Sequence, residues 1–333
     1  MHLGVTIPLD GFLNHHVTDL ARHAEKLGFT DAWSSETYQT DAFSPLAAAA
    51  AVTQRIRLGT AIVPVFTRPP ALIAMSAAAL QQASNGRFVL GLGITTPTIA
   101  TQWMGVEYKL PLTRMRETVA ALRMAFSQQK MTLKGKAIVV NGFRLDPSLE
   151  NPPPIYIGAQ GEKMLRLAGE LGDGVVVNFI TPETFPQMLA HIKEGARAAG
   201  RPADNFDVAC RIVIAVDQEH EIVREELRRE LTAYLTVPQY NKFFCEIGYA
   251  DEATVALEAW NHGDRKKALQ SVPDYMVDAI FISGTPDHWV QRLRDYEKAG
   301  ITTSAFKFNS YAKTPEEKRA RIMAAMEALA AAW

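Results

Sequence analysis

The sequence contains little cysteine and no long hydrophobic segment. Its two cysteines, Cys210 and Cys245, are far apart and form neither a Cys-x-x-Cys pair nor a zinc-binding spacing with histidine. We therefore expect two buried thiols in a reducing compartment and no metal site. No apolar run is long enough to span a bilayer, and residues 1–11 lack the basic flank of a signal peptide. These absences predict a cytoplasmic protein.

The sequence also carries almost no net charge. Lysine and arginine number 35, aspartate and glutamate number 36, and the formal net charge is -1. A chain with so little excess charge exerts no long-range attraction on nucleic acid or on anionic lipid. Because hydrophobic residues make up 47% of the chain, it can still bury a large core. We expect a globular protein that acts on a small molecule, with no nucleic-acid or membrane partner.

A repeating β-α pattern runs through most of the chain. Apolar strands buried on both faces, joined by right-handed crossovers, form either an open doubly wound sheet or a closed barrel. Eight strands favour the barrel, so we predict an α/β fold, a (β/α)8 TIM barrel, in one domain of residues 1–333. Insertions are predicted at about 97–150, with a hairpin over 131–145 turning at Asn141-Gly142, and at about 218–272. The eight predicted strands are residues 3–8, 31–34, 56–63, 87–93, 155–157, 175–177, 206–216 and 303–308.

One β-α-β unit, residues 155–178, contains a turn that points to a ligand. Its first strand enters a helix through Gly158 and Gly161. Such a turn leaves backbone N–H groups unpaired at the helix N-terminus, where the helix dipole also favours an anion. We expect a phosphate at this place. A tight turn without a ligand is the alternative.

Four short motifs occur in chain order near the predicted strand ends. They are RLGTAIVP (57–64) with TRP (67–69), SNGRFVLGLG (84–93), RMRE (114–117) after Gly105, and IGAQG (157–161) with GDG (172–174). Together they resemble the bacterial luciferase-like superfamily, and within it the branch that uses the deazaflavin coenzyme F420. The Gly-Ala-Gln-Gly turn in particular resembles methylenetetrahydromethanopterin reductases. The resemblance covers almost the whole chain.

The resemblance implies a homodimeric barrel that binds a flavin-type cofactor at its C-terminal mouth. It also implies a non-prolyl cis peptide in the third strand, by position Ala61-Ile62, behind the cofactor's ring. In the deazaflavin a carbon replaces the flavin's central nitrogen, which makes hydride transfer the natural step. We therefore expect a coenzyme F420-dependent oxidoreductase acting on an alcohol, an imine or an activated alkene. An FMN-dependent monooxygenase is the first alternative, and a non-catalytic flavin-binding relative is the second.

The expected cofactor contacts lie at the ends of the strands. Backbone N–H groups of residues 160–162 would hold the phosphate, helped by Lys163 if its side chain turns inward. Thr95 and Thr96 would bond the ring's polar edge or the ribityl-like chain, unless their hydroxyls only complete a turn. The full set of expected cofactor-binding residues is Thr6, Ala61, Ile62, Gly93, Thr95, Thr96, Gly158, Ala159, Gln160, Gly161, Lys163 and Asn178.

The chain departs from these relatives at their acid–base positions. Many of them place Asp-His at the end of the second strand, where this chain has Glu36-Thr37. An acidic residue past the fourth strand and an early glutamate are replaced by Thr96 and Thr6. Glu36 is left as the catalytic candidate, although it could equally bond backbone amides or pair with Arg68. Weaker candidates for the site are His15, His16, Arg68, Trp103, Met104, Lys109 and Arg114, of which Arg114 could instead pair with Glu117.

Overall fold

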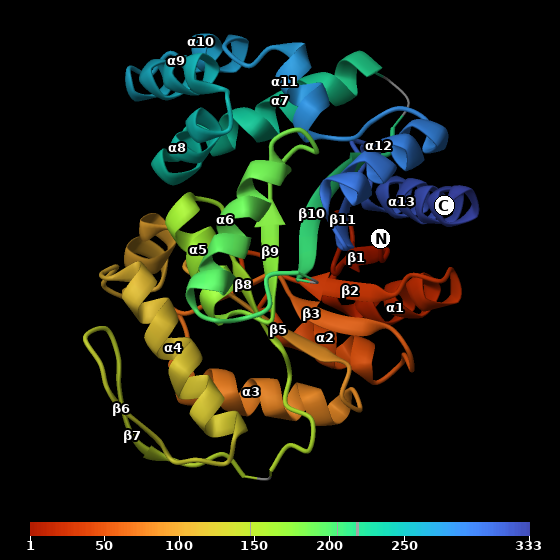
Figure 1. The fold of residues 1–333 in the computed structure, drawn as a ribbon. Helices are drawn as coiled ribbons and strands as arrows, with labels where there is room; N and C mark the ends of the chain where they lie inside the picture. The colour runs from red at the N-terminus through yellow and green to blue at the C-terminus, as the bar shows by residue number, and fades with distance from the viewer. Residues whose placement is uncertain (147, 205, 218–219) are drawn as a thin grey trace.

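The computed structural model describes residues 1–146, 148–204, 206–217 and 220–333. Eight parallel strands close into a barrel, with helices around the outside (Figure 1). Their order is β3-β2-β1-β11-β10-β9-β8-β5, and pairing of β3 with β5 closes the ring. The predicted (β/α)8 TIM barrel is confirmed. The barrel strands are β1 (Gly4–Thr6), β2 (Asp31–Ser34), β3 (Arg57–Thr60), β5 (Phe88–Gly93), β8 (Ile155–Gly158), β9 (Gly174–Asn178), β10 (Asp207–Ala215) and β11 (Thr303–Asn309).

The helices fall into two groups. Several begin with proline in their first turn, where a missing N–H costs no hydrogen bond. The outer helices are α1 (Val17–Lys26), α2 (Phe43–Ala50), α3 (Pro70–Ala83), α4 (Pro111–Phe126), α5 (Glu162–Leu171), α6 (Phe185–Ala198), α12 (Pro286–Ala299) and α13 (Pro315–Ala332). The second group is α7 (His220–Leu235), α8 (Pro238–Glu246), α9 (Ala250–Asn261), α10 (Arg265–Gln270) and α11 (Asp274–Ile280).

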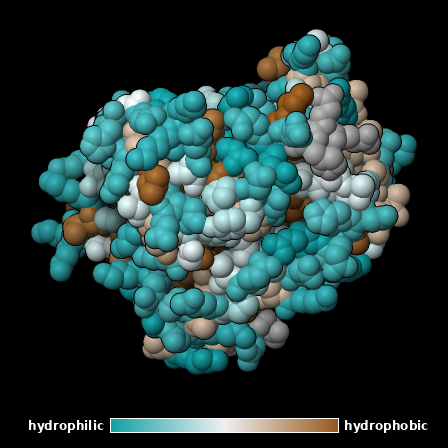
Figure 2. Space-filling model, turned by 90° about the horizontal axis from the view of Figure 1, so that it is seen from above, coloured by the Kyte–Doolittle hydropathy of each residue, from teal (hydrophilic) through white to brown (hydrophobic). Residues whose placement is uncertain are grey.

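The second group lies at the end of the barrel toward which β9 points (Figure 1). That end is the C-terminal mouth, where (β/α)8 enzymes carry their active sites. Seen from above, this face of the molecule is mostly hydrophilic, with hydrophobic residues scattered between polar ones (Figure 2). The predicted start of the insertion, residues 218 and 219, lies outside the described residues.

A hairpin outside the barrel, β6 (Met131–Lys134) with β7 (Val139–Phe143), corrects one prediction. The chain turns at residues 135–138, and the expected turn residues Asn141 and Gly142 lie inside β7 instead. The cause is a distant side chain. The Glu117 carboxylate on α4 accepts hydrogen bonds from the N–H groups of residues 136, 137 and 138 at 2.7, 2.9 and 2.9 Å. These charge-assisted bonds outweigh the local preference of Asn-Gly.

Glu117→Gln should loosen this hairpin without unfolding the barrel. Burial alone would raise the pKa of Glu117, but the three N–H donors outweigh it and lower the pKa. The carboxylate therefore stabilises the fold above its unfolded pKa of about 4.5, and this stabilisation is lost as the pH falls through the lower folded value. Hydrogen exchange of residues 131–143 should quicken in the variant at pH 7. Unchanged protection of the hairpin would contradict this role.

The barrel interior is layered. A middle layer of mostly apolar side chains fills the lumen, and Ala61 and Ile62 pack against it from the mouth side. At the N-terminal end Arg57 pairs with Asp31 and, at 2.7 Å, with Asp207. Ion pairs that close the N-terminal end stabilise such a barrel, and the opposite end is left for function. The middle layer is Trp33, Val89, Tyr156, Val176, Ala209 and Ala305.

The two cysteines differ in their burial. Both thiols are free, and Cys210 is buried as predicted, whereas Cys245 is only half-buried. Among the described residues no cluster of three His, Cys, Asp or Glu side chains is arranged to hold a metal ion. In the same residues no helix combines the length and the apolar character that crossing a membrane requires.

Candidate functional site

An apolar wall forms one side of the mouth, where β3 is interrupted before β4 (Val63–Pro64). The Ala61–Ile62 peptide bond is cis, as the resemblance implied. The Ala61 N–H donates to Ser34 O at 2.6 Å, and the Glu36 N–H donates to Ile62 O at 3.2 Å. The Ile62 side chain lies against two glycines. A Cβ on Gly93 would overlap Ile62, and one on Gly158 would lie 3.1 Å from its Cγ2.

The turn before α5 supplies backbone donors. Gly161 is the N-cap residue, and within the described ranges the N–H groups of residues 160–163 have no hydrogen-bond acceptor. The turn is held in place because the Ala159 N–H donates to Val176 O at 3.0 Å and Gln160 Nε2 donates to Asn178 O at 3.2 Å. Four free N–H groups at a helix N-terminus suit an anion. Lys163, however, is exposed.

Two of the other residues predicted to contact the cofactor, Thr96 and Asn178, have hydrogen-bond partners within the protein. Thr96 Oγ1 accepts a hydrogen bond from the Ile99 N–H at 3.3 Å, so its hydroxyl completes a turn. Asn178 Oδ1 accepts from the Phe179 N–H at 3.0 Å and supports the left-handed backbone of Phe179, whose φ is 55°. Thr95 is also left-handed, with φ 54°. Thr6 lies half-buried at the end of β1, beside the mouth.

Glu36 lies in a cavity of about 420 Å³ at the mouth. Its Oε2 pairs with Arg68 Nη2 at 2.7 Å, and its Oε1 accepts from Thr67 Oγ1 at 3.0 Å. Both alternatives left open for its structural role are present, because Oε2 also accepts a hydrogen bond from the backbone N–H of Ala42 at 3.5 Å. Met104 lines the same cavity. The cavity residues are Glu36, Thr37, Tyr38, Gln39, Thr40, Asp41, Thr67, Arg68, Leu72 and Met104.

The weaker candidates are mostly engaged elsewhere. Arg114 donates to the carbonyl oxygens of Val65 and Ala137, at 3.4 and 3.2 Å. It therefore supports loops and does not pair with Glu117, although its buried Nε has no acceptor among the described residues. Trp103 is exposed. Lys109 pairs with Glu107. His16 Nδ1 accepts a hydrogen bond from the Leu13 N–H. His15, which is exposed, lies with His16 on a short local helix, η1 (Asn14–His16).

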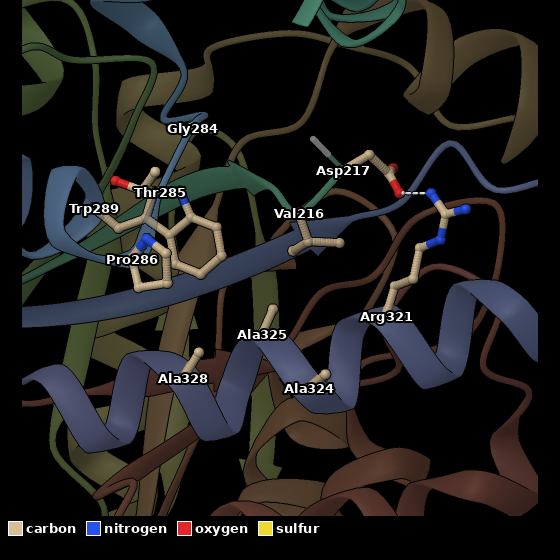
Figure 3. Close-up of a pocket in the computed structure, with 10 residues that line it drawn as sticks. All are labelled: Val216, Asp217, Gly284, Thr285, Pro286, Trp289, Arg321, Ala324, Ala325 and Ala328. Atoms are coloured by element: carbon tan, nitrogen blue, oxygen red, sulfur yellow. Dashed lines mark hydrogen bonds and ion pairs between the residues drawn. The ribbon is translucent and has the colours of Figure 1, made fainter. Parts of the chain in front are cut away.

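A larger cavity, of about 830 Å³, shares no lining residue with the Glu36 cavity (Figure 3). It is bounded by the segment after β10, by the start of α12 and by an alanine face of α13. Asp217 and Arg321 form an ion pair at one end. None of the residues predicted for the site line it. Its lining residues are Val216, Asp217, Gly284, Thr285, Pro286, Trp289, Arg321, Ala324, Ala325 and Ala328.

Two cations at the mouth were not assigned a role from the sequence. Arg211 on β10 and Lys307 on β11 follow Ala209 and Ala305, which face the lumen two residues earlier. Because strand side chains alternate, both cations also face inward. In the sequence, a charged residue at an inward position of a buried strand was the signal by which Arg211 and Lys307 could have been found.

The architecture defines the class of protein before any comparison. A closed (β/α)8 barrel whose mouth combines an apolar wall, free helix N–H groups and an ion-paired carboxylate has the features of an enzyme for a small molecule. Comparison with known proteins then gives the family, because the luciferase-like monooxygenase model matches residues 6–303. The chain belongs to the luciferase-like monooxygenase family.

Relatives within the family agree on oxidoreductase chemistry. The chain is 33% identical over 285 residues to a 5,10-methylenetetrahydromethanopterin reductase of Archaeoglobus fulgidus, covering 84% of this chain and 85% of that one. It is 27% identical over 310 residues to a putative coenzyme F420-dependent oxidoreductase of Mycobacterium tuberculosis, covering 87% and 89%. The predicted family and the oxidoreductase class are confirmed.

Solved structures show the same barrel. The coenzyme F420 dependent tetrahydromethanopterin reductase of Methanopyrus kandleri superposes with a TM-score of 0.76 at 26% identity, over 98% of this chain and 97% of that one. A type II Baeyer-Villiger monooxygenase of Pseudomonas putida, solved with FMN, gives a TM-score of 0.68 at 18% identity, over 99% and 96%. The second likeness shows the fold alone.

Proposed function

We propose that the protein is a coenzyme F420-dependent oxidoreductase that transfers a hydride between the deazaflavin ring and an alcohol, an imine or an activated alkene. The observation that carries the proposal is the Gly-Ala-Gln-Gly turn. Its sequence resembles the reductase relatives, and its four N–H groups lack acceptors within the described ranges. FMN also has a phosphate, so an FMN-dependent monooxygenase is the competing candidate, favoured by the family's name.

The residues at the mouth fit such a cofactor. Backbone N–H groups of residues 160–163 would hold its phosphate, and the Ile62 wall would back its ring. When bound, the deazaflavin supplies a carbon that gives or accepts a hydride. The chain has to orient the substrate against that carbon and keep water away from it. Gly93 and Gly158 keep the Ile62 wall in position, because side chains at these two residues would displace Ile62.

An anaerobic turnover assay tests the proposal. Protein is mixed with oxidised or reduced coenzyme F420 and a panel of alcohols, imines and enones, and the absorbance of the deazaflavin is followed. We expect at least one compound class to change the ring's oxidation state without oxygen. In a parallel assay in air, oxygenation of a compound by reduced FMN that requires the protein, together with no change of the deazaflavin, would establish the competing monooxygenase. Tight binding of either cofactor without turnover would favour the non-catalytic alternative.

Glu36 is the proposed acid–base residue of this reaction. Its carboxylate lines the mouth cavity and is oriented by Arg68 and Thr67. Glu36→Gln should lower kcat by about 100-fold or more, the usual contribution of a positioned acid or base, and leave the affinity for the cofactor unchanged. Arg68→Gln is the control. If both variants lower kcat equally and leave the same pH profile, Glu36 acts only by holding Arg68.

We also propose a homodimer in the cytoplasm. The dimer is suggested by exposed apolar side chains near the mouth, since Leu72, Met75, Trp103 and Met104 are all 39% exposed or more. Leu72 and Met75 lie one helical turn apart on α3, on one face. Light scattering should give twice the chain mass at micromolar concentration, and Met75→Glu should shift it toward the monomer. A monomer in the wild type would contradict the proposal.

A further inference from the structure

The two cations at the mouth differ in what surrounds them. Lys307 Nζ pairs with Glu230 Oε1 on α7 at 2.8 Å, and the same carboxylate accepts from Asn309 Nδ2 at 2.9 Å. Lys307 is therefore neutralised by the protein. Arg211 lies beside Tyr234, but in the described part of the chain no ion pair joins it to a carboxylate. Its Nε is buried and, among those residues, without an acceptor.

An uncompensated guanidinium next to a buried strand is costly unless an anion completes its hydrogen bonds. Arginine is suited to this, since its planar fork binds a carboxylate through two parallel bonds. On the neighbouring strand Asn178 lies in register with Arg211, and its side chain is already used by Phe179. The polar groups beside Arg211 therefore leave its charge available to a ligand.

The position of Arg211 within the barrel indicates which ligand. Around the closed ring, β10 is four strands from β3 in either direction, so Arg211 lies across the mouth from the Ala61–Ile62 wall. A cofactor backed by that wall would present its other face toward Arg211. A substrate bound on that face would lie between the two.

Aromatic side chains flank the guanidinium. The ring of Tyr234 lies 4.3 Å from that of Phe179 and 5.0 Å from that of Tyr240, and both tyrosines are half-buried. Burial raises the pKa of Tyr234, so its hydroxyl stays protonated at neutral pH. Rings of this kind contact the apolar body of a ligand, and the guanidinium beside them contacts its charged end.

We propose that Arg211 binds a carboxylate of the substrate, whose apolar or aromatic body lies on Tyr234. The substrate class is then an alcohol, imine or activated alkene that also bears a carboxylate. This inference rests on the proposed function, because it places the substrate against the cofactor face opposite the Ile62 wall. The carboxylate would distinguish the substrates from uncharged compounds that carry the same reactive group.

Benzoate and benzamide are suitable probes, because they share shape and differ in charge. Each is titrated calorimetrically into protein saturated with coenzyme F420. Benzoate should bind about tenfold tighter or more than benzamide, the discrimination that a hydrogen bond to a charged group provides. Arg211→Gln should abolish the difference, and Arg211→Lys should restore part of it. Arg197→Gln, which removes an exposed arginine of α6, is the matched control and should behave as the wild type.

The outcomes separate this inference from the proposed function. Equal binding of the two probes by the wild type, or a preference for benzoate that survives Arg211→Gln, would overturn it. A loss of coenzyme F420 affinity in Arg211→Gln would also overturn it, because the arginine would then belong to the cofactor site. If the protein binds no coenzyme F420 and yet prefers benzoate through Arg211, the anion site stands and the cofactor proposal fails.

Discussion

Gly161→Asp is expected to weaken coenzyme F420 binding by at least about 100-fold, because a carboxylate would face the bound phosphate across a few ångströms. The fold should tolerate the change. Gly161 has φ -74° and ψ 153°, which any residue can adopt, and the nearest atom to a Cβ there is Glu246 Oε2 at 3.8 Å. Aspartate is also a favourable N-cap next to the helix dipole, so the free energy of unfolding should rise by roughly 0.5 kcal/mol.

The opposite signs of these two effects make the test sharp. Fluorescence titration with coenzyme F420 gives the affinity, and denaturant unfolding gives the stability. Gly161→Asn is the matched control, since it has the same shape and capping ability without the charge, and should lose much less affinity. An aspartate variant that binds as well as the wild type would remove the phosphate from this turn. Equal losses in both variants would show that size rather than charge is responsible.

Gly93→Ala should damage the apolar wall that lies beside this turn. Its Cβ would overlap the Ile62 side chain, which would then have to move from the wall. Overpacking of this kind typically costs about 1–3 kcal/mol of stability. We expect cofactor affinity to fall by about tenfold or more. The displaced Ile62 side chain would have to return to its original position before the cofactor could bind, and this would cost part of the same free energy. Tight binding and unchanged stability in Gly93→Ala would contradict the role of the wall.

Two further variants, Gly158→Ala and Ile62→Ala, test whether overlap with Ile62 causes the loss of stability in Gly93→Ala. Gly158→Ala should be milder, because its Cβ would lie 3.1 Å from Ile62 Cγ2 and the side chain can yield slightly. Ile62→Ala removes the atoms that Gly93→Ala would overlap. The double variant Gly93→Ala/Ile62→Ala should therefore be less destabilised than the sum of the single changes, measured as a double-mutant cycle. Simple additivity would place the clash elsewhere.

Much of the barrel was predictable because its signals are local. Buried strands appear as short apolar runs, and β2 coincides with its predicted bounds at residues 31–34. Helix α13 likewise begins at a local signal, since Pro315 stands in its first turn. The turn at residues 158–161, for which a phosphate is proposed, was predictable for the same reason, because glycines between a strand and a helix constrain the backbone at that position whatever lies around it.

What the sequence concealed depends on contacts between distant residues. The hairpin turn was misplaced because Glu117, some twenty residues earlier, binds the true turn. Similarly, no local pattern could decide between the alternatives for Glu36, or show that Glu230 would neutralise Lys307 and leave Arg211 without a carboxylate among the described residues. The predicted roles of Thr6, Thr95 and Glu36 in cofactor binding or catalysis stay predictions.

The most direct test of the account is a side-by-side fluorescence titration of the apo-protein with coenzyme F420 and with FMN at modest salt. The proposed function predicts micromolar or tighter binding of the deazaflavin and much weaker binding of FMN. The reverse preference would contradict it and would place the protein with the oxygen-using members of its family.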